Sequence, residues 1–292
     1  MKVVTSDNYR QRLTKVIDYI YDNLEGDLAV NTLADVAMMS PYHFHRIYRE
    51  VTQSTVNATV RRLRLQRAAA DLIRTDQSIL TVAKRASYGS PEAFTRAFTQ
   101  CFGLAPKEYR EYKHRDGYRL EPFIAMLPEQ TKKVSTMFSV DIIDHEATSL
   151  VGYSHSGDYM EIGSQFEKLF VYAMNKQLLG EETRSIGLYY DDPQSVPVET
   201  LRSMACITVG DACELSGDEP PEAVEIPAGR CATVLFKGPY AELEKPYEWL
   251  FGHWLPESGF EAADFPPFEE YLNDPKETPP NELLTRIHCL LK

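Results

Sequence analysis

The spacing of apolar residues changes once along the chain, between about residues 113 and 135. In the first part, apolar side chains recur at intervals of three and four, as in Phe44, Ile47 and Tyr48, which is typical of one buried face of a helix. In the second part, short apolar runs bounded by Gly, Pro or Asp alternate with helical stretches, which indicates strands joined to helices. The pattern therefore predicts an all-α part followed by an α+β part.

The helical part repeats itself at a spacing of about 50 residues. TLADVAMMSPYHFHRIYREVTQSTV, from Thr32, aligns with TVAKRASYGSPEAFTRAFTQCFGLAP, from Thr81. Each copy has a short helix with small alanines, a turn, and a Ser-Pro pair that suits the N-cap and first position of a second helix. The repeat predicts two helix-turn-helix units, and the second helix of each buries one face and leaves the opposite face free for DNA.

The segment between the two copies, VNATVRRLRLQRAAADLIRT, contains neither Gly nor Pro. It predicts one long helix that holds the two units at a fixed distance. Its arginines are placed either to flank a phosphate backbone or to form a solvated basic face; they are Arg61, Arg62, Arg64 and Arg67.

The α+β part also repeats, at a spacing of 81 residues. YSHSGDYMEIGSQFEKLFVYA, residues 153–173, aligns without a gap to VLFKGPYAELEKPYEWLFGHW, residues 234–254. Each unit has a strand that ends at Gly-x-Tyr, a helix, and two short strands around an Asp-Pro turn, with FSVDIID or AVEIPAG adding a strand in front. Two such units predict pseudo-two-fold symmetry with a concave site at their junction.

The net charge of −12 is divided unevenly between the two parts. Residues 1–115 hold 18 Lys and Arg against 12 Asp and Glu, whereas residues 116–292 hold 13 against 31. An excess of positive charge in the first part suits contact with DNA phosphates, although a mildly charged helical surface has the same count. Because no apolar run reaches the roughly 18 residues of a spanning helix and no signal-peptide core is seen at the N-terminus, we expect a cytoplasmic protein.

The five cysteines are odd in number and lack the spacing of metal ligands. We expect buried, reduced thiols at Cys101, Cys206, Cys213, Cys231 and Cys289, and neither a metal nor a cofactor. The chain also lacks a recognisable nucleophilic triad or a Gly-rich phosphate loop.

Residues 8–113 resemble the DNA-binding domain of AraC/XylS-family transcription regulators. The resemblance is carried by SPYHFHRIYRE, RLRLQRAAADLIRT and ILTVAKRASYGSPEAFTRAFTQCFGLAPKEYR. The first half departs from the family at Thr52-Gln53-Ser54-Thr55-Val56, where a Gly and a Pro are usual, so we expect an altered helix end there. In this family the two recognition helices enter successive major-groove segments about 34 Å apart.

Carried over by position, the resemblance places two sets of side chains at DNA. Arg46 and Arg96 suit guanine or phosphate contact, and Glu92 suits a cytosine amino group. Pro91 cannot read a base by hydrogen bonding. The predicted DNA-binding residues are Tyr42, His45, Arg46, Arg61, Glu92, Thr95 and Arg96.

Residues 135–292 resemble the GyrI-like effector-binding domain, which also occurs at the C-terminus of Rob-type AraC regulators, and residues 114–134 would be the linker. The pieces GDY, GPY, LPESGF and FEEYLNDP carry the resemblance. It implies a cleft for a small, cationic or amphipathic molecule, with Glu269 inside it. A carboxylate among aromatic rings favours an organic cation. The predicted wall residues, for which core packing is the alternative role, are Trp249, Trp254, Tyr240 and Tyr189.

Together these features predict a ligand-responsive, DNA-binding transcription regulator rather than an enzyme. Its expected partners are double-stranded DNA, a small-molecule effector and, as a further possible partner, RNA polymerase, with no membrane. A second hypothesis is a hydrolase in which Glu269, with Tyr189 or Tyr240, activates water as a general base. A third is a module that sequesters a drug or protein without regulating transcription.

Overall fold

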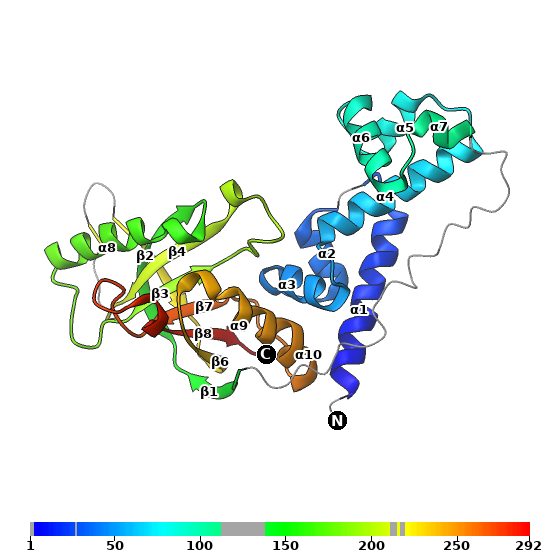
Figure 1. Cartoon of the computed structure of the whole chain (residues 1–292). Coiled ribbons are helices and arrows are strands. Elements are labelled where there is room, and N and C mark those ends of the chain that lie inside the picture. The colour runs from blue at the N-terminus through cyan, green and yellow to red at the C-terminus, as the bar shows by residue number, and fades with distance from the viewer. Residues whose placement is uncertain (1–2, 27, 112–137, 211–214, 217–219) are drawn as a thin grey trace.

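The computed structural model describes residues 3–26, 28–111, 138–210, 215–216 and 220–292, with side chains described from residue 9 onward. Its first part is helical and its second part is a sheet with helices (Figure 1). The predicted linker, residues 114–134, lies outside the described residues. None of the described helices is long and apolar enough to cross a membrane.

The helical part consists of two helix-turn-helix units joined by one long helix, as predicted. The first unit is α2 (Val30–Ala37) and α3 (Pro41–Thr52), preceded by α1 (Val3–Asp22). The connecting helix is α4 (Val56–Arg74). The second unit is α5 (Ile79–Arg85) and α6 (Pro91–Phe102), followed by α7 (Pro106–Glu111).

Local sequence accounts for where the second helix of each unit begins and ends. At α6, the Ser90 hydroxyl accepts a hydrogen bond from the Ala93 N–H, and Gly103 ends the helix in the left-handed conformation. At α3, Gln53 takes the left-handed conformation at φ 53°, in the segment where the family has a glycine. The altered segment therefore leaves the helix end intact, at the modest cost of a non-glycine residue in that region.

The second part is an eight-stranded antiparallel sheet with the order β1-β6-β8-β7-β3-β4-β2-β5. The first repeat contains β1 (Asp141–His145), β2 (Thr148–Ser156), η3 (Tyr159–Glu161), α8 (Gly163–Asn175), β3 (Ser185–Tyr189), η4 (Val198–Thr200) and β4 (Arg202–Thr208). The second contains β5 (Glu222–Ile226), β6 (Gly229–Lys237), η5 (Tyr240–Glu242), α9 (Glu244–Glu248), η6 (Trp249–Trp254), α10 (Leu255–Ser258), β7 (Phe268–Tyr271), η7 (Pro280–Glu282) and β8 (Leu284–Leu290).

The strand order reads the same in both directions when the two repeats are exchanged, which confirms the predicted pseudo-two-fold symmetry. The axis passes between β3 and β7, whose residues Gly187 and Glu269 face each other. The leading strands are exchanged between the repeats, because β1 pairs with β6 of the second repeat and β5 pairs with β2 of the first. The sequence repeat did not reveal this exchange.

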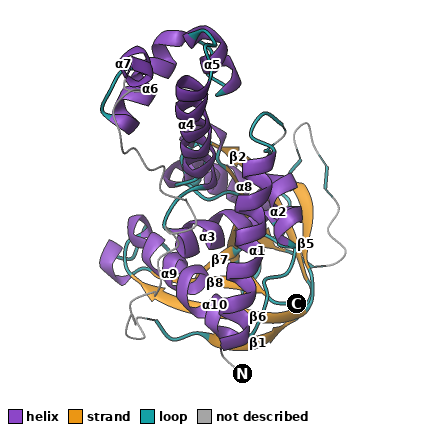
Figure 2. Cartoon of the chain, turned by 90° about the vertical axis from the view of Figure 1, so that its right-hand side faces the viewer, coloured by secondary structure: helices purple, strands orange, loops and turns teal. Residues whose placement is uncertain are grey.

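The hydrophobic cores do not follow the predicted boundary between the two parts. One core joins α1, α2 and α3 to β6, β8, η6 and α10; it includes Leu13, Leu33, Phe44, Leu250 and Phe251. The second helix-turn-helix unit has its own core, around Leu72, Phe94 and Phe98. Accordingly α1 lies against α10 and α3 lies against η6, while α5–α7 stand away from the sheet at the far end of α4 (Figures 1 and 2).

The expectation of buried thiols holds for three of the cysteines and is wrong for one. Cys206, Cys231 and Cys289 are buried and free, whereas Cys101 on α6 is exposed. Burial raises the pKa of the Cys231 thiol to about 12, so this group stays protonated at neutral pH. Cys213 lies outside the described residues.

Candidate functional site

Glu269 lies near the pseudo-two-fold axis, on the central strand β7, and its side chain is buried. Each of its carboxylate oxygens accepts a hydrogen bond from a tyrosine: Tyr247 donates to Oε1 at 3.1 Å and Tyr271 donates to Oε2 at 2.9 Å. The hydroxyls of Tyr271 and Tyr189 are 2.6 Å apart. The carboxylate is thus oriented by a set of tyrosines drawn from both repeats.

Burial raises the pKa of Glu269 to about 7, because removing the carboxylate from water disfavours its charged form. The hydrogen bonds from Tyr271 and Tyr247 and the nearby positive charge of Arg46 act in the opposite direction and lower this pKa. Glu269 therefore titrates near neutral pH. A cation bound beside it favours the charged form.

The adjacent Glu270 has different surroundings. It forms an ion pair with Arg286 at 3.0 Å and approaches His288 at 3.3 Å and Arg184 at 3.6 Å. The hydrogen bond from His288, together with the positive charges, lowers the pKa of Glu270 to about 2. Its charge is already neutralised by protein groups, so of these two carboxylates it is Glu269 that is available to a ligand.

A cavity of about 1560 Å³ opens at Glu269. Tyr189 and Tyr240 line it, as the sequence predicted, together with Tyr247 and Tyr271. Helix α8 adds an apolar wall of Phe166, Phe170, Val171 and Met174. Val171 is 62% exposed and Met174 is 68% exposed, so this wall offers apolar surface to a ligand.

Gly187 makes room for the tyrosines around Glu269. A Cβ at this position would lie 2.8 Å from both the Tyr189 ring and the Tyr271 hydroxyl. The sequence holds a signal for this arrangement, because aligning the Asp-Pro turns of the repeats at Asp192 and Asp274 places Gly187 opposite Glu269. One repeat thus supplies the carboxylate, and the other supplies the space that its hydrogen-bond partners occupy.

The two predicted tryptophans lie outside this cavity. Trp249 is 8% exposed and packs against His253, with ring centroids 5.4 Å apart. Trp254 stacks on Phe260 and belongs to the core shared with α1–α3. Their segment, η6, is a π-helix that packs against α3. The prediction that both rings face the cavity is therefore wrong, because η6 is turned towards the helical part.

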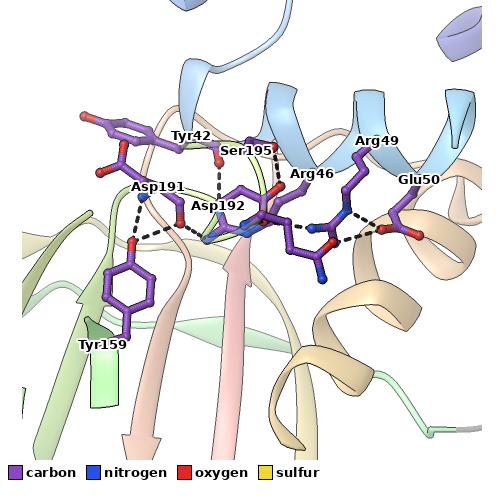
Figure 3. A network of polar contacts seen from close by, with 9 residues as sticks. Tyr42, Arg46, Arg49, Glu50, Tyr159, Asp191, Asp192 and Ser195 are labelled. Atoms are coloured by element: carbon purple, nitrogen blue, oxygen red, sulfur yellow. Dashed lines mark hydrogen bonds and ion pairs between the residues drawn. The ribbon is translucent and has the colours of Figure 1, made fainter. Parts of the chain in front are cut away.

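The sequence predicts that the first recognition helix, α3, has a face free for DNA. The structure contradicts this prediction. His45 is 6% exposed and Arg46 is 4% exposed. Arg46 donates hydrogen bonds to the carbonyl oxygens of Tyr42 and Asp191, at 2.8 and 2.7 Å, and Tyr42 packs against Tyr190. Figure 3 shows Arg46 and Arg49 reaching from α3 to Asp191 and Asp192. The reason is that α3 packs on the α+β part.

The second recognition helix, α6, presents its predicted residues at the surface. Glu92 and Arg96 are exposed, and Thr95 is half-buried. Arg96 and Arg61 line one groove of about 630 Å³ between α6 and α4. In contrast, Arg64 donates to the Leu24 carbonyl oxygen and Arg67 pairs with Glu25 at 3.0 Å, so these two bind other parts of the helical region.

Within the described ranges, no three His, Cys, Asp or Glu side chains are arranged to hold a metal ion.

Two family models match the chain in the order that the fold indicates. A helix-turn-helix domain of the AraC type matches residues 33–112. A GyrI-like small molecule binding domain matches residues 138–291, which is more than half of the chain.

Relatives support the same two parts. The chain is 33% identical over 107 residues to YbfP, an uncharacterized HTH-type transcriptional regulator of Bacillus subtilis (strain 168), across 37% of the chain and 36% of YbfP. It is 31% identical over 138 residues to the DNA gyrase inhibitor of Erwinia billingiae (strain Eb661), across 47% of the chain and 87% of the inhibitor. The match to YbfP therefore spans only about a third of that relative.

Among solved structures, the EcmrR–DNA complex aligns over 89% of the chain and 84% of EcmrR, with a TM-score of 0.48 and 16% identity.

Proposed function

The chain belongs to the GyrI-like small molecule binding domain family and joins that domain to an AraC-type helix-turn-helix domain, and on this premise we propose that it is a ligand-responsive transcription regulator. It binds double-stranded DNA through its helical part and an amphipathic organic cation in the cavity at Glu269. RNA polymerase is a further proposed partner.

The observation that carries the ligand class is the position of Glu269. A buried carboxylate held between tyrosines, in a cavity with an apolar wall on α8, matches a positive charge attached to an apolar body. The carboxylate supplies charge attraction, the tyrosine rings supply cation–π attraction, and α8 supplies apolar contact. A neutral ligand of the same shape gains only the last of these.

The test is calorimetry with two compounds. Tetraphenylphosphonium is the cation, and triphenylphosphine oxide is the neutral aromatic comparison. We expect the cation to bind and Glu269→Gln to weaken it by about tenfold or more, since tenfold is only about 1.4 kcal/mol. Binding of triphenylphosphine oxide should change little in the same variant.

A matched control is Glu161→Gln. This residue is an exposed glutamate of the first repeat that does not line the cavity. We expect it to leave cation affinity unchanged. Equal affinity of wild type and Glu269→Gln for tetraphenylphosphonium would contradict the proposed role of Glu269.

A hydrolase is the second candidate, because a carboxyl with a pKa of about 7 also suits a general base. We favour binding because each oxygen of Glu269 already accepts a tyrosine hydroxyl. Incubation with an activated ester or an epoxide separates the candidates. Catalytic turnover by wild type that is lost in Glu269→Gln would support the hydrolase.

A further inference from the structure

The two recognition helices come from equivalent positions of the repeat, yet they have different surroundings. Arg46 and Arg96 are repeat mates; Arg46 is 4% exposed, whereas Arg96 is exposed. Ser40 and Ser90 are also repeat mates. The Ser90 hydroxyl caps its own helix, whereas the Ser40 hydroxyl donates to Asp264 of the α+β part at 2.8 Å. The sequence motif is the same, but α3 packs on the α+β part.

The contacts of α3 with the α+β part extend along the helix. His43 approaches the Phe265 carbonyl oxygen at 2.9 Å and stacks on Phe251 with centroids 5.2 Å apart. Arg49 pairs with Asp192 at 3.0 Å. Because the same face contributes Phe44 and Ile47 to the shared core, separating α3 from η6 would expose core side chains to water. The position of α3 is therefore structural.

Arg46 reaches from this helix into the wall of the effector cavity. Its guanidinium carbon lies 5.3 Å from the centroid of the Tyr247 ring, and the Tyr247 hydroxyl donates to Glu269. It also lies 5.7 Å from the Phe251 centroid. Arg46, Arg49 and Glu50 all line the cavity. A built-in cation thus occupies an aromatic face beside the carboxylate that we assign to the ligand.

We propose that Arg46 is an effector-site residue and not a DNA-reading residue, so that α3 forms a wall of the cavity and sequence reading rests on α6. This inference rests on the proposed function, since it takes a cation as the ligand of Glu269. A second positive charge entering the cavity is repelled by Arg46 and shares Tyr247 and Glu269 with it. Arg46 therefore limits how tightly the site holds a cation.

The repeat supplies a matched pair of variants, Arg46→Met and Arg96→Met, both of which keep an unbranched apolar stem. Each is assayed as the full chain for tetraphenylphosphonium binding and for binding to a duplex selected by the wild-type chain from a random-sequence pool. We expect Arg46→Met to raise cation affinity about tenfold, because a like charge is removed, and to leave duplex affinity unchanged. We expect Arg96→Met to lower the affinity for the duplex about tenfold or more and to leave the cation affinity unchanged.

The opposite pattern overturns the inference. If Arg46→Met lowers the affinity for the duplex as much as Arg96→Met does, with no change in cation affinity, then α3 reads DNA. Failure of the wild type to bind tetraphenylphosphonium, or equal binding by Glu269→Gln, contradicts the proposed ligand class instead. The duplex measurements still decide the role of α3 in that case.

A footprint on the selected duplex tests the same point without a variant. One recognition helix protects base edges in a single major-groove segment, whereas two helices protect two segments about 34 Å apart. We expect protection of one segment by the wild-type chain, in the presence and absence of tetraphenylphosphonium. Protection of two segments in either state would show that α3 reaches the groove.

Discussion

At the scale of single residues, two neighbouring glutamates on one strand have pKa values shifted in opposite directions. Glu269 and Glu270 are adjacent on β7, and successive side chains of a strand point to opposite faces. Glu269 accepts two tyrosine hydroxyls in a buried site, whereas Glu270 is paired with Arg286, Arg184 and His288. Their pKa values are accordingly about 7 and about 2. Of these two carboxylates, Glu270 is held by ion pairs and Glu269 by hydrogen bonds from tyrosines.

This difference predicts a pH dependence of stability that belongs to Glu269. Its pKa is about 7 in the folded chain and its ordinary value is 4.5, so the folded state binds the proton more tightly. The group's contribution to the free energy of unfolding is therefore fully present below about pH 4.5 and is lost as pH rises to about 7, by up to about 3 kcal/mol. Glu269→Gln should lack this loss.

The measurement is urea unfolding of wild type and Glu269→Gln at pH 5 and pH 8. The difference between the two proteins should shift in favour of the variant at the higher pH. Glu161→Gln, at an exposed site, should follow wild type at both pH values. A wild-type-minus-variant difference that is constant with pH would mean that Glu269 has an ordinary pKa.

At the scale of elements, the helix of the second α+β repeat is remodelled where it meets α3. The equivalent helix of the first repeat, α8, is a regular α-helix, whereas the second copy is divided into α9, the π-helical η6 and α10. Val171 of α8 is exposed, and its repeat mate is Gly252. A Cβ on Gly252 would lie 2.7 Å from Cβ of Glu50 on α3. The glycine thus permits the close approach of η6 to α3.

Gly252→Ala should therefore destabilise the contact between η6 and α3. The new methyl group has no space unless α3 shifts, and overpacking of this kind typically costs about 1–3 kcal/mol. Urea unfolding measures the cost. Gly180→Ala is the control, because a Cβ there has nothing within 4 Å among the described atoms. An equal, near-zero effect of both substitutions would show that α3 does not pack closely on η6 in solution.

At the scale of the whole molecule, the chain is organised around its cores and not around its two sequence repeats. The first helix-turn-helix unit shares a core with the second α+β repeat, and the second unit has a core of its own at the far end of α4 (Figure 1). The effector cavity and the first unit therefore form one body, and α4 connects it to the exposed α6.

This organisation predicts two unfolding transitions. Leu72→Ala, in the core of the second unit, should lower the midpoint of one transition and leave the other unchanged, because it removes about 2–5 kcal/mol from that core alone. Leu33→Ala, in the shared core, should lower the other transition. Differential scanning calorimetry distinguishes the two, and a single transition shifted by both substitutions would contradict the independence of the cores.

The sequence by itself determined the elements, their repetition and the residue that carries the ligand hypothesis. Apolar periodicity and Ser-Pro caps predicted both helix-turn-helix units, and the 81-residue repeat predicted the pseudo-symmetric sheet, because local spacing governs helices, strands and turns. The resemblance to the GyrI-like domain implied a cleft with Glu269 inside it, and in the structure Glu269, Tyr189 and Tyr240 line one cavity.

Only the tertiary structure decided which faces of these elements are covered. The spacing of residues in an amphipathic helix identifies one apolar face. Whether its remaining face is buried or free depends on what packs there, and local spacing does not indicate this. The fold buried Arg46 and His45 and left Arg96 exposed from the same motif, turned Trp249 and Trp254 away from the cavity, and exchanged β1 and β5 between the repeats. Each of these outcomes depends on contacts between segments far apart in the chain.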